Sequence, residues 1–154
     1  MENKIEDIFS WDGYNNIGIG SIAIASVLNY RKVLSVPKAL LVIPMITHTP
    51  TLSYMSSKST LNRSSAALTS GFPNLFTNFN ERFEDSLPLS LNSIQYLVHL
   101  GYAKFDQNLI FLKKLEIDNE FGTRAEKIFI ASKKISQLLN DDSEELFLNL
   151  RIKL

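Results

Sequence analysis

The sequence lacks cysteine, has only two histidines and contains no apolar run long enough to cross a bilayer. Without cysteine the chain can form no disulfide, no thiolate nucleophile and no zinc site with sulfur ligands. His48 and His99 are far apart in the chain and match no metal-ligand spacing. The apolar stretches at 17–28 and 39–46 are separated by basic residues, and each is shorter than the ~20 residues of a spanning helix. We therefore expect no membrane segment, no cofactor and no metal site.

Acidic side chains are absent from residues 13–80, although the whole chain has 16 acids and 16 bases. The net charge is −3 over residues 1–12, +5 over 13–80 and −2 over 81–154. The central segment therefore offers no acidic general base. Its excess of positive charge is instead available to phosphates or to a partner.

Paired carboxylates occur only as immediate neighbours, as in Asp141-Asp142. Adjacent residues on a helix point about 100° apart, so such a pair does not face a substrate from two sides. We interpret these pairs as solvated helix ends. The sequence predicts that the protein is not an enzyme, and the remaining catalytic hypothesis is a reaction that uses His48 or His99.

The composition, with 45% apolar and 21% charged residues, is that of a folded protein. A chain of 154 residues is long enough for one hydrophobic core, so we predict a compact single domain over 1–154. The first seven residues lack the basic and apolar regions of an export signal. We expect a cytoplasmic protein.

The first predicted helix spans 17–31. Asn15 and Asn16 precede its first apolar residue, where a side-chain oxygen caps free backbone N–H groups. Apolar residues occur nearly all round the helix, which predicts a buried central element. Its "GIGSIA" stretch matches a phosphate loop, but a polar turn precedes it and no acid follows before Glu81. Small residues that let another helix approach closely are the better interpretation.

The apolar run at 37–46 has no period that separates a buried helix from a buried strand. A proline at its start suits a first helical turn and favours the helix, and Pro44 then predicts a kink or a stop. A short helix near 52–55 and another over 61–70 are expected to follow.

Residues 72–114 predict a helix, a second helix and a hairpin. The apolar positions of the first helix fall at spacings of three and four: Phe72, Leu75, Phe76, Phe79, Phe83 and Leu87. We expect Pro88 to break this helix, Ser90 to cap a second helix over 91–100, and the alternating residues 102–113 to form the hairpin. This is the order of a winged helix, with a helix-turn-helix followed by a wing.

Two helices are predicted after the hairpin. Thr123 and Glu126 fit a capping box, followed by an apolar stripe, and predict a helix over 123–139. Ser143 is placed to cap a last short helix that continues to Leu150.

The predicted fold class is therefore mainly α with a small β-hairpin (α+β). Within the single domain we distinguish an N-terminal helical part at 1–70, a winged-helix-like part at 72–114 and C-terminal helices at 121–154.

The predicted helix over 91–100 is also a candidate contact face. Four of its side chains share the side opposite the core: Asn92, Gln95, Tyr96 and His99. Asparagine and glutamine suit adenine edges in a major groove, but this helix has no lysine or arginine. The wing adds only Lys104, Lys113 and Lys114. Because phosphate contacts supply most of the affinity for DNA, we favour a protein-docking face or ordinary surface over direct DNA reading.

The acid-free segment supplies the remaining candidate contacts to phosphate or to a partner: Arg31, Lys32, Lys58 and Arg63. Even if all five positive charges of the segment contacted phosphates, log K would fall with log salt at a slope of only roughly −4.5. Such binding is weak and nonspecific.

Four stretches together resemble a known family. They are Asn15-Asn16-Ile17 with Tyr30 near the helix end, "LLVIPMITHTPTLSYMSSKST" followed by Leu61-Asn62-Arg63, "LGYAKFDQNLIFLKK", and the C-terminal "EELFLNLRIKL". In order and spacing, from about 14 to 154, the chain resembles the small middle component of three-component ABC ATPase conflict systems, a group that includes Lamassu-type phage defence. An asparagine-proline pair commonly opens the first helix in that family, whereas here Ile17 stands in the proline position.

The resemblance implies a non-enzymatic subunit encoded beside an SMC- or Rad50-like ABC ATPase and an effector, often a nuclease. Such a subunit would bridge these two partners and hold the effector inactive until the ATPase senses foreign DNA, touching DNA weakly or only through the complex. The alternative from the residues themselves is a stand-alone winged-helix DNA-binding regulator.

Overall fold

The central element of the fold is the helix α2 (Tyr14–Arg31). The structure is a computed structural model that describes residues 14–153 apart from 59 and 61, so the start of the predicted N-terminal part lies outside the described residues. Residues 20–28 of α2 are buried apart from the partly buried Ile22. The predicted buried helix is therefore confirmed. It begins at Tyr14, so Asn15 and Asn16 lie within it and do not precede it.

Short helices follow α2 and lead to the second half of the chain. They are α3 (Val36–Ala39), α4 (Val42–Ile46), α5 (Thr49–Ser56) and α6 (Ser65–Gly71). The helical interpretation of the apolar run is confirmed, but the chain turns at Leu40 and Leu41, before Pro44. Pro44 lies in the first turn of α4. Backbone N–H groups in the first turn of a helix have no helical partner, so a proline there removes no helical hydrogen bond.

The predicted helix-turn-helix is not formed. After the short turn η2 (Pro73–Phe76), α7 runs without interruption from Phe79 to His99 and contains Pro88. Pro88 removes the hydrogen bond to the carbonyl of Glu84, but both residues are exposed, so water can bind that carbonyl. Ser90, predicted as a cap, is fully buried in the middle of α7. Burial of one side of α7 therefore outweighs the proline, and the winged helix is not confirmed.

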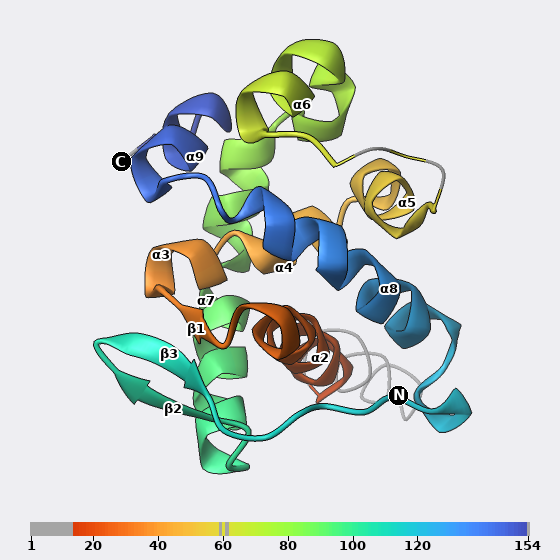
Figure 1. The fold of residues 1–154 in the computed structure, drawn as a ribbon, viewed down its shortest axis with the longest axis vertical. Coiled ribbons are helices and arrows are strands. Elements are labelled where there is room, and N and C mark those ends of the chain that lie inside the picture. The colour runs from red at the N-terminus through yellow and green to blue at the C-terminus, as the bar shows by residue number, and fades with distance from the viewer. Residues whose placement is uncertain (1–13, 59, 61, 154) are drawn as a thin grey trace, which may run out of the picture.

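The predicted hairpin is confirmed as β2 (Ala103–Asp106) and β3 (Asn108–Phe111), with Gln107 at φ 62° in the turn. A third strand, β1 (Val33–Leu34), was not predicted, because two residues carry no readable period. It pairs antiparallel with β3, which gives the strand order β1-β3-β2. The fold is mainly helical with a small three-stranded antiparallel sheet (Figure 1).

The C-terminal helices are α8 (Thr123–Leu138) and α9 (Ser143–Asn149), and η3 (Asn119–Phe121) precedes them. The capping box is wrong, because Gly122 at φ 92° is the residue before the helix and Thr123 is already in it. Likewise Ser143 begins α9 and does not cap it. None of the described helices is long and apolar enough to span a membrane.

The segment between the sheet and α8 is fastened to the central helix by one side chain. The Asn29 amide nitrogen donates to the Leu115 carbonyl at 2.9 Å, and the Leu115 backbone N–H donates to the Asn29 amide oxygen at 3.0 Å. The Asn29 side-chain amide thus donates one hydrogen bond to the Leu115 backbone and accepts one from it, as the backbone of a neighbouring strand would.

Helices approach closely at Gly20, in the part of α2 that packs against α7 and α4 (Figure 1). A methyl group on Gly20 would overlap the hydroxyl of Ser93 and lie 2.9 Å from the Ile43 methyl. The same addition at Gly18 meets no atom within 4 Å. This confirms that a glycine of the "GIGSIA" stretch serves helix packing.

We predict opposite effects of alanine at these two glycines. Gly18→Ala should raise the free energy of unfolding by about 0.5–1 kcal/mol, because glycine is unfavourable in a helix. Gly20→Ala should lower it by about 1–3 kcal/mol through overpacking against α7. Urea unfolding of both variants measures the difference, and equal effects at both positions would contradict the close approach.

Candidate functional site

The predicted contact face on α7 is exposed. Asn92, Gln95, Tyr96 and His99 all lie on the solvent side of the helix, as expected from their spacing. Two apolar residues, Leu91 (48% exposed) and Val98 (38% exposed), lie on the same side. This mixture of apolar, aromatic and amide side chains is suited to protein contacts.

Two cations of the acid-free segment bind the C-terminal end of α8 and are not free. Arg31 Nη1 donates to the Ser136 carbonyl at 3.2 Å, and Lys38 Nζ donates to the Leu139 carbonyl at 2.7 Å. Positive charges are favourable there because the last carbonyls of a helix are partly negative. Burial, and then the nearby charge of Arg31, lowers the pKa of Lys38. Arg31, which the sequence suggested as a contact to phosphate or to a partner, therefore also joins the end of α2 to the end of α8.

The other predicted cations do not gather at one site. Three lie over aromatic rings: Lys32 over Phe111 at 3.7 Å, Arg63 over Phe72 at 5.4 Å and Lys113 over Tyr102 at 5.0 Å. Lys58, Lys104 and Lys114 are exposed. Lys104 is in β2 and Lys58 is in the loop after α5, so they belong to different parts of the fold.

His48 belongs to a chain of hydrogen bonds that joins α5 to η2. Its Nδ1 lies 2.8 Å from the Thr51 hydroxyl oxygen, and that hydroxyl donates to the Leu75 carbonyl at 2.7 Å. Because Thr51 has only one proton to give, His48 is the donor to Thr51. Burial, and then the positive charge of Arg82, lowers the pKa of His48, while the Leu75 carbonyl acts in the opposite direction.

Arg82 connects the same network to α4. Its two terminal nitrogens donate to the carbonyls of Pro44 and Leu75, each at 3.0 Å, and its guanidinium lies 5.1 Å from the centre of the Phe79 ring. Sequence reasoning missed Arg82, because an arginine on an amphipathic helix reads as solvated and Pro44 is 38 positions away. Arg82 thus holds the two short elements α4 and η2 against α7.

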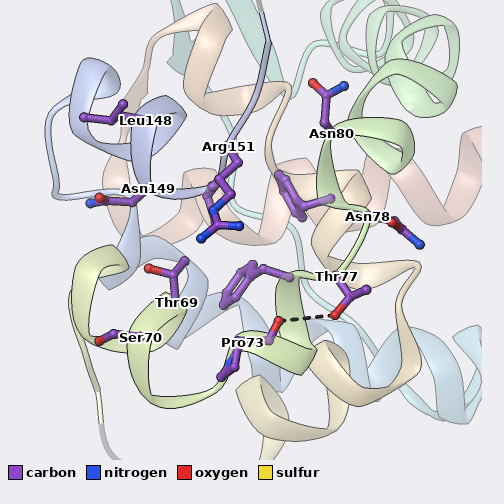
Figure 2. Close-up of a pocket in the computed structure, with 12 residues that line it drawn as sticks. Thr69, Ser70, Pro73, Thr77, Asn78, Asn80, Leu148, Asn149 and Arg151 are labelled. Atoms are coloured by element: carbon purple, nitrogen blue, oxygen red, sulfur yellow. Dashed lines mark hydrogen bonds between the residues drawn. The ribbon is translucent and has the colours of Figure 1, made fainter.

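A cleft of about 580 Å³ lies between α6, η2, the start of α7 and α9 (Figure 2). The Arg151 side chain reaches into it towards Thr69. Thr77 donates to the Pro73 carbonyl at 3.3 Å on one side, and Leu148 is 77% exposed on the other. Among the described residues that line the cleft, Arg151 is the only charged one, so these residues supply no acid-base pair.

The acids of the described residues serve mainly at helix ends. Asp141, interpreted from the sequence as solvated, accepts hydrogen bonds from the Ser65 backbone N–H at 2.8 Å and from the Ser65 hydroxyl at 2.6 Å. The Asp141 carboxylate thus provides a hydrogen-bond partner for a free backbone N–H at the N-terminus of α6. Within the described part of the chain, no three histidine or acidic side chains are close enough together to hold a metal ion.

This arrangement defines a small, mainly helical protein with a three-stranded antiparallel sheet. The family model described as "ABC-three component (ABC-3C) system Middle Component 3" matches residues 16–154, and the chain belongs to this family. The resemblance read from the sequence is confirmed at that level. Neither the curated proteins nor the solved structures gave a match.

The lowered pKa of His48 predicts a stability that depends on pH. Below about pH 6.5 the unfolded chain binds a proton at this position that the folded chain takes up only at lower pH. Stability should therefore fall as the pH drops from about 6.5 towards the lowered folded pKa. Urea unfolding at pH 7.5 and 5.5 should show a larger loss for the natural chain than for His48→Asn.

Asparagine is the matched control because it keeps a polar side chain before α5 and cannot titrate. Equal losses in the two proteins would show that His48 does not cause the dependence.

Proposed function

We propose that this protein is a non-catalytic scaffold of an anti-phage defence complex that works in the cytoplasm. It bridges an SMC- or Rad50-like ABC ATPase and a nuclease-type effector, and it restrains the effector until the ATPase senses foreign DNA. Membership of the ABC three-component middle-component family is the observation that carries this proposal. The SMC-like ATPase, the nuclease and the restraint come from the Lamassu-type resemblance.

The arrangement of the helices supports a bridging role. α2 packs against both α7 and α8, so the outer side of α7 and the outer side of α8 face away from a shared core. A bridge needs two such separate surfaces. The exposed face with Gln95, Tyr96 and Val98 supplies one of them.

The use of the basic residues weakens the alternative of an independent DNA-binding regulator. Arg31 and Lys38 bind carbonyls of α8, which leaves three of the five cations of the acid-free segment. Three phosphate contacts correspond to a salt slope of only roughly −2.7. The uninterrupted α7 also lacks the turn from which a recognition helix would project.

Co-expression with the products of the two neighbouring genes should yield a stable complex that co-purifies through size-exclusion chromatography. Mass photometry of the peak should give a mass that includes all three chains. If the protein elutes alone at micromolar concentrations of all components, the bridging role is wrong.

A separate prediction concerns catalysis. The double variant His48→Asn and His99→Ala should keep nearly full protection of cells in a phage plating assay, because neither imidazole acts in a reaction. An immunoblot for equal protein levels is the control. A loss of protection of about tenfold or more at equal levels and with the complex intact would point to chemistry at a histidine.

A further inference from the structure

A groove lies between the end of α2, the loop after α5 and the outer side of α8. It consists of two adjoining hollows of about 560 and 380 Å³, which share Tyr30, Lys133 and Gln137 in their linings. The larger hollow is also lined by the end of α5 and by Ser57, Lys58, Thr60 and Asn62 after it. The groove is separate from the α7 face and from the cleft of Figure 2.

The lining of the groove is strongly positive. It contains Arg31, Lys58, Lys133 and Lys134, and no acid is among the described residues that line the two hollows. Lys58 and Lys133 are exposed, and the described residues give neither of them a hydrogen-bond or ion-pair partner. A concentration of one sign of charge in a concave surface attracts an oppositely charged partner.

Lys134 adds a fixed charge at the floor of the groove. Its Nζ donates to the Ser57 carbonyl and to the Thr60 hydroxyl, and it lies 5.9 Å from the centre of the Tyr54 ring. Burial lowers the pKa of Lys134. These contacts hold the loop after α5 against α8, so the groove has a firm wall.

Apolar surface is exposed in the same groove. Tyr30 is 48% exposed and Ile130 is 43% exposed, while Met55 and Phe129 lie beneath them as buried or partly buried lining. The aliphatic part of this surface, at Ile130 and Met55, can be covered by an apolar side chain of a protein segment, whereas a sugar-phosphate backbone offers little apolar surface.

Two polar atoms at the groove also lack partners. The Arg31 Nε donor and the Gln137 Oε1 acceptor are shielded from water, and neither has a hydrogen bond. Such groups are unfavourable until they are paired. Because both atoms are shielded from solvent, a bound segment could pair with them only if the Arg31 and Gln137 side chains moved, so the choice of occupant rests on the exposed charges and apolar surface of the groove.

We propose that this groove binds an acidic segment of another component of the ABC three-component system. Carboxylates of the segment pair with Lys58 and Lys133, and an apolar side chain of the segment packs between Tyr30 and Ile130. The inference rests on the proposed function, because it names the site on this chain at which one bridged partner docks.

The test uses the co-purified complex with charge-reversal variants of the middle component. Lys58→Glu with Lys133→Glu should lower the yield of one partner in the purified complex by about tenfold or more, because two attractive pairs become repulsive. The control is Arg124→Glu with Lys153→Glu, which changes the net charge equally on exposed cations outside the groove lining. The control should retain the partner.

Carbodiimide cross-linking of the natural complex identifies the occupant directly, because this reagent joins lysine amines to carboxylates without a spacer. Mass spectrometry should find Lys58 and Lys133 joined to aspartate or glutamate of one partner chain. Cross-links to a partner that come only from other lysines would overturn the groove as the docking site.

The outcomes separate the two proposals. If the natural chain forms no complex, the bridging function fails. If the complex forms and the groove variant keeps its partner as well as the control does, the groove inference fails while the bridging function stands. Loss of the natural complex after nuclease digestion would assign the groove to nucleic acid.

Circular dichroism checks the fold of the variant, and Lys58→Gln with Lys133→Gln replaces it if the glutamates prevent folding.

Discussion

The burial of α2 on all sides is the constraint on which the rest of the structure depends. A helix that is apolar nearly all round can be stable in water only when other elements cover every face. α7, α8 and α4 provide that cover, and Gly20 lets the α7 backbone come close enough to exclude water. The continuity of α7 through Pro88 follows from the same need, because a break would uncover one side of α2.

The second organising feature is the pairing of cations with backbone carbonyls at the ends of short elements. Arg31 and Lys38 bind the end of α8, while Arg82 and Lys134 bind carbonyls in the acid-free part of the chain. These bonds replace the ion pairs that a segment without acids cannot make internally. They also occupy two of the five cations of the acid-free segment, so the net charge of that segment overstates the positive charge that is free to bind phosphate.

The surfaces that remain free fit a protein that works by contact. The α7 face with Gln95 and Tyr96 is mixed and nearly neutral, whereas the groove around Lys58 and Lys133 is positive and partly apolar. Two surfaces of different chemistry on different sides of one core suit two different partners. From the family membership we expect these partners to be other components of an ABC three-component system. From the positive charge of the groove we expect one of them to present an acidic segment.

The sequence by itself determined the elements whose signals are local. The apolar periodicity of α8, the alternation and turn around Gln107 and the all-round apolar character of α2 each lie within about twenty consecutive residues, and each was predicted correctly. Only the tertiary structure decided that α7 continues through Pro88, that β1 joins the sheet and that Arg31 donates a hydrogen bond to a carbonyl of α8. In these cases the deciding energy comes from burial or hydrogen bonds to residues distant in the chain, and a local pattern contains no information about such partners.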